Sequence, residues 1–113
     1  MSDWIKLHRR MIDGPINTNS QALHLWVNLL LITHWNKNPK RVQMTTGNGM
    51  KEITIRRGQC VFYKNEIANK MNVSKNTVVK YLDWLEYEEM IETIYSGRFT
   101  IVKIIKWEQY QGV

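Results

Sequence analysis

Residues 64–89 constrain the fold of this chain more than any other stretch, because two helical patterns meet there at a short polar link. Apolar residues recur at helical spacing in residues 66–71 and again after Ser74, with Asn72 between the two segments. The Ser74 hydroxyl is placed to accept the N–H of Thr77, which is a common cap at the start of a helix. Two helices joined by a turn this short predict a helix-turn-helix.

The second helix of this motif has one apolar face and one polar face. Val78, Leu82 and Leu85 recur at helical spacing and are expected to face the core. In helix-turn-helix proteins the N-terminal end of the second helix enters the major groove of DNA. Lysine and asparagine side chains can hydrogen bond to base edges there, and the helix N-terminus also favours a phosphate. The polar face that we predict to contact DNA consists of Ser74, Lys75, Asn76, Thr77 and Lys80.

A strand-turn-strand pattern follows the motif over residues 90–106. Apolar and polar residues alternate, the chain turns at Gly97, and a second alternating run returns. We interpret this hairpin as the wing of a winged helix-turn-helix. Arg98 at its tip is placed to reach a backbone phosphate or a minor groove, and Lys64 at the start of the motif completes the predicted DNA-binding set.

The charge of the chain is polarised along its length. Its net charge is +6 and its pI is about 9.6, an excess that favours a polyanionic partner. Residues 1–82 contain 13 Lys and Arg against 4 Asp and Glu, whereas residues 83–92 contain five acidic residues and no basic one. The sign changes inside the second helix of the motif, so the acidic far end of that helix would leave the groove without opposing the phosphates.

The remaining elements supply the support for this motif. Asp3 can cap a helix predicted over residues 4–12, which forms an N-terminal helical extension. Residues 20–34 form another predicted helix, which is apolar nearly all round and therefore expected in the core. Residues 42–55 alternate on both sides of a glycine-rich turn and predict a hairpin. Residues 56–59 predict a further turn, whose two arginines are expected in solvent.

These elements give one domain over residues 1–113, of the α+β class but mostly helical, as suits a chain of this length. Cys60, the single cysteine, cannot form an intrachain disulfide and is expected to be a small buried apolar residue. No apolar run approaches the roughly 20 residues needed to span a bilayer, and the N-terminus lacks a signal peptide's apolar core. We therefore expect a cytoplasmic protein with no membrane partner.

No arrangement of residues suited to catalysis or metal binding stands out. His8, His24 and His34 have no carboxylate or cysteine at ligand spacing, so neither a metal nor another cofactor is expected. The chain has no Gly-rich phosphate loop, no paired carboxylates and no nucleophile–base set, so we expect that it is not an enzyme. The tryptophans expected in the core or at an interface are Trp4, Trp26, Trp35 and Trp107.

Five segments of the chain resemble a known family. They are WIKLHRRMID at residues 4–13, LWVNLLL at 25–31, RRGQ at 56–59, VSKNTVVKYLDWLE at 73–86 and IIKWEQYQ at 104–111. Their order is similar to that in the N-terminal winged-helix domain of phage replisome organisers, which are replication-initiation proteins related to the DnaD family. The resemblance implies a winged helix that acts in phage or prophage DNA replication, by origin binding or by recruiting a helicase loader in the bacterial host.

Two other functions fit the same residues. In one, the domain is an oligomerisation and partner-docking module of a replisome organiser, with aromatic residues of its N-terminal helices at a homo-oligomer interface. In the other, it is a small transcriptional regulator, which would make the same contacts with double-stranded DNA at a promoter instead of an origin.

Overall fold

Helix α1 (Ser20–Ile32) lies at the centre of the fold in the computed structural model, which describes residues 5–111. Asn19 caps its start, because its side-chain oxygen accepts the N–H of Ala22 at 3.2 Å. The predicted helix is confirmed, but the prediction that it is buried on all sides is wrong. Leu31 and Ile32 are 61% and 37% exposed, whereas the side facing the core holds Ala22, Leu25, Trp26, Leu29 and Leu30.

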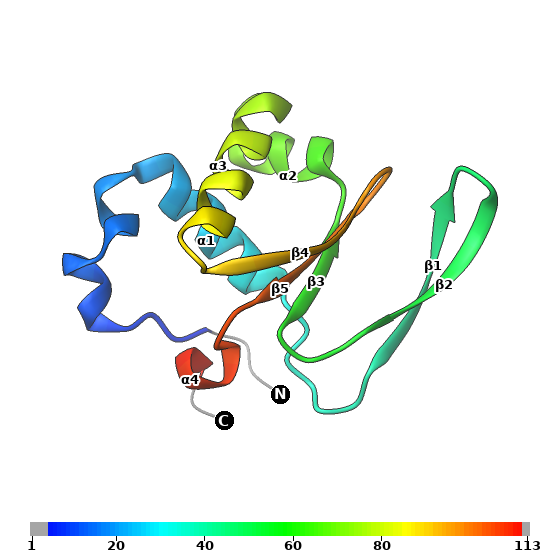
Figure 1. The fold of residues 1–113 in the computed structure, drawn as a ribbon, viewed down its shortest axis with the longest axis horizontal. Helices are drawn as coiled ribbons and strands as arrows, with labels where there is room; N and C mark the ends of the chain where they lie inside the picture. The colour runs from blue at the N-terminus through cyan, green and yellow to red at the C-terminus, as the bar shows by residue number, and fades with distance from the viewer. Residues whose placement is uncertain (1–4, 112–113) are drawn as a thin grey trace.

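Helices α2 (Lys64–Met71) and α3 (Lys75–Tyr87) are joined by a tight turn, as the sequence predicts (Figure 1). Asn72 closes α2 in the left-handed conformation, with φ of 57°, which asparagine tolerates better than most residues. The predicted apolar residues of both helices are buried against α1 and the sheet, and Tyr81 joins them at 9% exposure.

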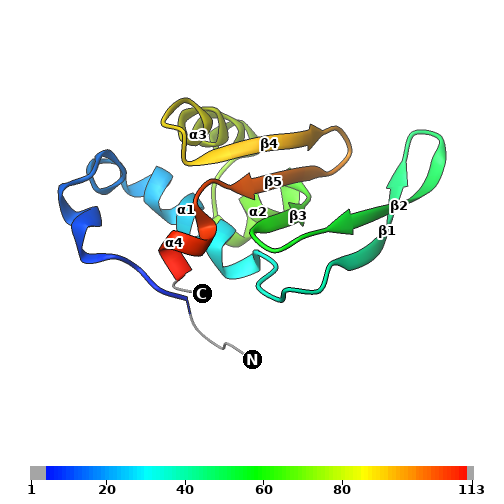
Figure 2. The ribbon, with the colours of Figure 1, turned by 60° about the horizontal axis from the view of Figure 1, so that its bottom comes forward.

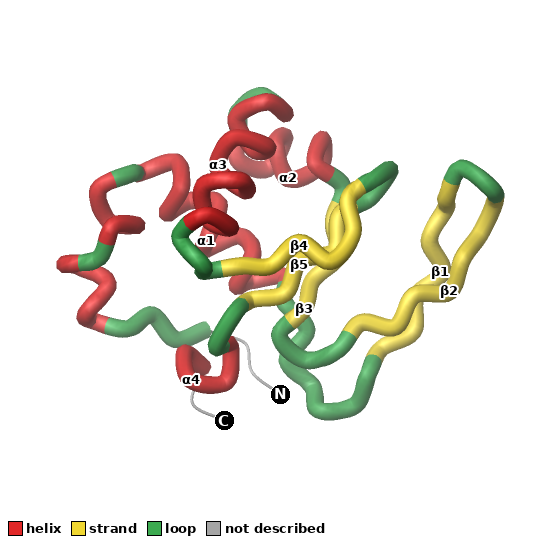
Figure 3. The backbone as a smooth tube through the Cα atoms, in the orientation of Figure 1, coloured by secondary structure: helices red, strands yellow, loops and turns green. Residues whose placement is uncertain are grey.

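A three-stranded antiparallel sheet forms the second layer of the core, with β5 (Thr100–Ile104) between β3 (Gln59–Phe62) and β4 (Ile91–Ser96). The predicted return strand ends at Ile104 instead of residue 106. Cys60, Phe62, Val102 and Ile104 point from this sheet into the main core beneath the helices. Figure 3 shows α1, α2 and α3 gathered on one side of the strands.

The predicted hairpin of residues 42–55 is present and longer than expected. It consists of β1 (Lys40–Thr46) and β2 (Gly49–Ile55), which pair with each other only, in a separate two-stranded sheet. Both views of the ribbon show this hairpin projecting beside the three-stranded sheet (Figures 1 and 2).

The predicted N-terminal helix over residues 4–12 is wrong for the part that the structure describes, while its cap Asp3 and Trp4 lie outside the described residues. Two short 3-10 helices, η1 (Arg9–Asp13) and η2 (Pro15–Thr18), occupy this region instead. The cause is tertiary. The Gln111 side chain accepts the N–H of Lys6 at 3.0 Å and donates to the Lys6 carbonyl at 3.3 Å, which holds this segment extended.

Helix α4 (Trp107–Gln111), which the sequence patterns did not predict, packs against the turn before β3. Arg57 is not a solvated residue of that turn, contrary to expectation. Its guanidinium lies 5.5 Å from the ring centroid of Trp107 and 3.4 Å from a carboxylate oxygen of Glu108. Gly58, at φ of 83°, passes so close to Trp107 that an added Cβ would lie 3.2 Å from the Trp107 Cβ. Arg57 and Gly58 therefore anchor α4.

Candidate nucleic-acid interface

The start of α3 is organised by a side-chain cap. The Ser74 Oγ accepts the N–H of Thr77 at 3.2 Å, as predicted, and shares a second hydrogen bond of 2.9 Å with the Thr77 Oγ1. Both hydroxyls are therefore engaged with each other, and Thr77 is half-buried. Lys75 and Asn76 are exposed on the same first turn. Of the predicted contacts on this turn, those two side chains are the most available to a ligand.

Lys80 is exposed one turn further along α3. Its Nζ lies 5.2 Å from the ring centroid of Tyr81, within the range of a cation–π contact. Tyr81 itself is 9% exposed, so its ring supports the lysine stem at the edge of the core. The ammonium group still faces solvent and extends the positive charge of the first turn along the helix.

The tip of the β4–β5 hairpin carries the other predicted residues. The Lys64 Nζ donates a hydrogen bond of 2.9 Å to the Ser96 Oγ, which ties the start of α2 to the tip. Tyr95 stacks on Phe99 with ring centroids 4.7 Å apart. Arg98 is exposed at the tip. The tip is therefore held by the Lys64–Ser96 hydrogen bond and the Tyr95–Phe99 stack, and it exposes the guanidinium of Arg98.

The predicted residues form two groups instead of one cluster. One group runs along the start of α3, and the other joins Lys64 to the β4–β5 tip. Figure 1 shows the start of α3 and this tip directed toward the same side of the molecule. Within residues 5–111 the ion pairs are Arg41–Glu52, Arg57–Glu108 and Lys70–Glu66, so none of the predicted cations is neutralised by one of these pairs.

The opposite end of α3 is acidic and is partly used for structure. Glu86 accepts the N–H of Thr93 at 2.9 Å, which connects the last turn of the helix to β4. Asp83 and Glu89 are exposed nearby, and Tyr87 is 83% exposed. The charge gradient seen in the sequence is therefore a gradient along the surface of one helix.

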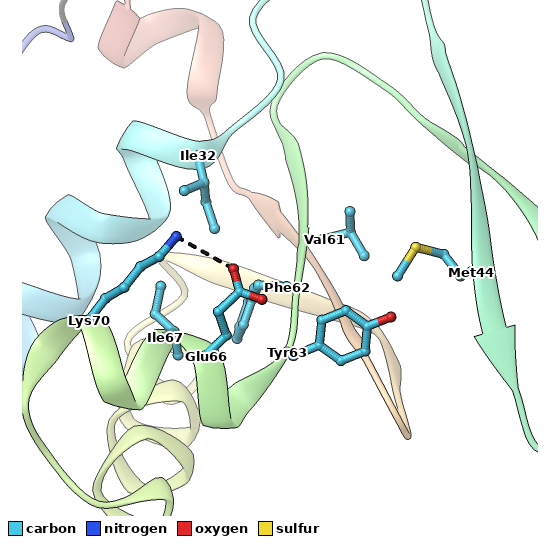
Figure 4. A pocket seen from close by; sticks show the side chains of 8 residues that line it. All are labelled: Ile32, Met44, Val61, Phe62, Tyr63, Glu66, Ile67 and Lys70. Atoms are coloured by element: carbon cyan, nitrogen blue, oxygen red, sulfur yellow. Dashed lines mark ion pairs between the residues drawn. The ribbon is translucent and has the colours of Figure 1, made fainter.

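The chain has a hollow of about 250 Å³ between α2, the end of α1 and the β1–β2 hairpin (Figure 4). Its walls are mostly apolar, and its two charged residues, Glu66 and Lys70, pair with each other at 3.5 Å. This hollow offers shape and apolar surface but no free reactive group.

Cys60 is 1% exposed, which confirms the prediction that it is buried. Burial raises the pKa of its thiol from 9.0 to about 12, although hydrogen bonds with Thr33 and Val102 partly oppose this change. Such a thiol is a poor nucleophile at neutral pH. Among the described residues, no three His, Cys, Asp or Glu side chains lie close enough together to hold a metal ion.

Comparison of the chain with family models, with curated proteins and with solved structures finds no match. None of the helices in residues 5–111 has the length and apolar character needed to cross a bilayer.

Proposed function

We propose that this chain is a winged-helix protein that binds duplex DNA, with α3 as its recognition helix and the β4–β5 hairpin as its wing. The observation that carries the proposal is the polarity of α3. Its capped first turn exposes Lys75 and Asn76 with Lys80 behind them, whereas its last turns are acidic. Only the first turns are suited to lie between two strands of phosphates.

The first turn of α3 also has the chemistry for reading bases. Asn76 can pair with adenine through two hydrogen bonds, and Lys75 can donate to guanine acceptors. Arg98 would contact the backbone or the minor groove beside this site. Ser74 and Thr77, whose hydroxyls bond each other at 2.9 Å, would act by fixing the helix start.

The biological process is proposed on the sequence resemblance to phage replisome organisers. In that role the protein would bind a replication origin or recruit a helicase loader in the bacterial host. Selecting bound fragments from a phage or host genome tests this role. Enrichment of origin fragments would support it, whereas enrichment of promoters would indicate a transcriptional regulator.

A double substitution tests the recognition helix directly. Lys75→Ala with Lys80→Ala should reduce the magnitude of the slope of log K against log salt by about 0.9 to 1.8, because each phosphate contact that is lost contributes about 0.9 and Lys75 also faces the bases. Fluorescence anisotropy with a labelled duplex of roughly 20 base pairs, titrated at several salt concentrations, measures the slope. Lys37→Ala is the matched control, since Lys37 is exposed in the loop before β1. An unchanged slope in the double variant would exclude α3 as the recognition helix.

A second function, oligomerisation, is favoured by a separate surface. Large apolar side chains are exposed around the end of α1 and the start of α2: Leu31 is 61%, Trp35 41% and Tyr63 40% exposed. Exposed groups of this kind often mark protein interfaces. Tyr63 lines the apolar hollow of Figure 4, and Leu31 and Trp35 line a second hollow. Ile32 and Val61 line both hollows.

Sedimentation at micromolar concentration distinguishes this function. If the surface is an interface, the protein is a dimer or larger, and Leu31→Glu converts it to a monomer. Tyr87→Glu is the control, because Tyr87 is exposed at the far end of α3. A monomeric unsubstituted protein would rule out oligomerisation through this surface.

A further inference from the structure

The β1–β2 hairpin is fixed to the β4–β5 hairpin by a small apolar cluster of its own. Its buried members are Met44 and Ile55 from the first hairpin and Phe99 and Ile101 from the second. Val42, Ile53 and Val61 pack against them. An isolated two-stranded hairpin is marginally stable in water, so this cluster is what holds the β1–β2 hairpin in place.

The register of the hairpin places a lysine at the open end of this cluster. Lys51 pairs directly with Met44 across the strands, so the two side chains share one face of the ribbon. Met44 is buried, whereas Lys51 is exposed. The Met44–Lys51 pair is nearer the turn of the hairpin than the Val42–Ile53 pair, so Lys51 lies at the edge of the cluster that is closer to the tip. Arg98 directly precedes Phe99, the cluster's buried ring from the other hairpin. Each hairpin therefore carries one exposed cation next to a residue of the cluster, Lys51 beside Met44 and Arg98 before Phe99.

The outer face of the β1–β2 hairpin is also suited to a polar partner. Arg41, Gln43, Thr45, Glu52 and Thr54 are all exposed there. The Arg41 guanidinium lies 3.8 Å from the Glu52 carboxylate, which leaves Lys51 as the cation near the tip outside these ion pairs. A narrow β-ribbon with donors and acceptors on this face, and with Lys51 near the tip on the opposite face, resembles the ribbons that contact DNA in other folds.

The arrangement in space places this hairpin beside the candidate interface. Figure 1 shows the β1–β2 tip and the β4–β5 tip both directed toward the upper side of the view, where the start of α3 also lies. The longest dimension of the molecule is 45 Å, and the β1–β2 hairpin lies at one end of it. That dimension corresponds to about 13 base pairs of B-form DNA at about 3.4 Å each.

We propose that the β1–β2 hairpin is a second DNA-contacting arm, which extends the footprint of the domain beyond the wing. Lys51 contacts the phosphate backbone of the duplex whose major groove receives α3. This proposal rests on the DNA binding proposed above. It assigns a role to a hairpin that sequence patterns identified only as a structural element.

Salt-dependent binding tests the arm. Lys51→Ala should reduce the magnitude of the slope of log K against log salt by about 0.9 and weaken binding about eightfold near 0.1 M salt. Lys51→Arg should restore both values, because it keeps the charge. The matched control is Lys37→Ala, which removes one exposed charge from the loop at the base of the same hairpin. Thermal unfolding of each variant checks that the fold is kept.

The outcomes separate the two proposals. If Lys51→Ala behaves like Lys37→Ala while Lys75→Ala with Lys80→Ala weakens binding, the arm is overturned and the recognition helix stands. If none of these variants changes binding, both proposals fail. A loss with Lys51→Ala that Lys51→Arg restores, with no loss for Lys37→Ala, supports the arm.

Discussion

The two hairpins of this protein differ in how their residues are buried. The β4–β5 hairpin belongs to a sheet with both faces covered. Val102 and Ile104 of β5 face the main core, and Ile101 faces the small cluster shared with β1–β2. The β1–β2 hairpin is covered on one face only, and Ile55 is the single buried residue of β2.

Because of this difference, we expect the β4–β5 hairpin to be integral to the fold and the β1–β2 hairpin to be attached to it. A strand buried on both faces cannot move without disturbing two clusters. A hairpin held on one face can open alone, because its opening exposes only the small cluster. The β1–β2 hairpin should therefore be the first part of the domain to open.

The largest expected effect comes from truncating Phe99, the residue that the β4–β5 hairpin buries most deeply in the small cluster. Phe99 is 1% exposed, so Phe99→Ala should destabilise the protein by about 3–4 kcal/mol through lost burial and a cavity. Ile53 on β2 is half-buried, so Ile53→Ala should cost only about 1–2 kcal/mol. Urea unfolding measures both. Equal losses would show that the two hairpins are equally integral to the fold.

Sequence patterns predicted the elements whose signals are local. The turn at Asn72, the Ser74 cap and the stripe from Val78 to Leu85 follow from neighbouring residues, and all are present. The prediction of an N-terminal helix was wrong, and there Gln111 binds the Lys6 backbone across 105 positions of sequence. Helix α4 was missed, and it packs on Arg57 and Gly58 from a distant part of the chain.

The candidate site was predictable only in part, for the same reason. Exposure of Lys75 and Asn76 follows from the periodicity of α3. The engagement of Lys64 with Ser96 and the position of Lys51 beside Met44 depend on strand pairing and tertiary packing. The first of these contacts joins residues 32 positions apart, and the second depends on the register of the hairpin. Periodicity within one segment predicts neither.

Alkaline pH should weaken the three-stranded sheet through Cys60. Its pKa is about 12 in the folded protein against 9.0 ordinarily, so above pH 9 the unfolded chain loses the proton first. Stability is then lost by about 1.4 kcal/mol per pH unit between pH 9 and 12. Urea unfolding at pH 8 and pH 10 measures the slope, and Cys60→Ala should reduce it. An equal slope in that variant would assign the effect to other groups.

The same substitution, Thr→Val, should affect stability differently in the three-stranded sheet and in the β1–β2 hairpin. The Thr100 side chain on β5 is 1% exposed, and its hydroxyl has no hydrogen-bond partner. Thr100→Val should therefore raise stability by about 1 kcal/mol, because an unsatisfied buried hydroxyl is replaced by a methyl group. Thr54→Val on the exposed face of β2 is the control and should change little. A loss of stability in Thr100→Val would contradict the burial of an unpaired hydroxyl.

The most local expected effect is confined to the β1–β2 tip. Gly49 has φ of 109°, which side chains rarely adopt, whereas Gly47 has no such conformation and open space around its Cβ position. Gly49→Ala should cost the hairpin about 1–2 kcal/mol, and Gly47→Ala should be close to neutral.

Amide hydrogen exchange locates this loss within the domain. If the hairpin opens by itself, Gly49→Ala speeds exchange in β1 and β2 by about tenfold or more and leaves the amides of Val102 and Ile104 unchanged. If β5 loses protection to the same extent, the β1–β2 hairpin unfolds together with the main core. Its one-sided burial would then not make it an independent unit, and it would be as rigid as the three-stranded sheet.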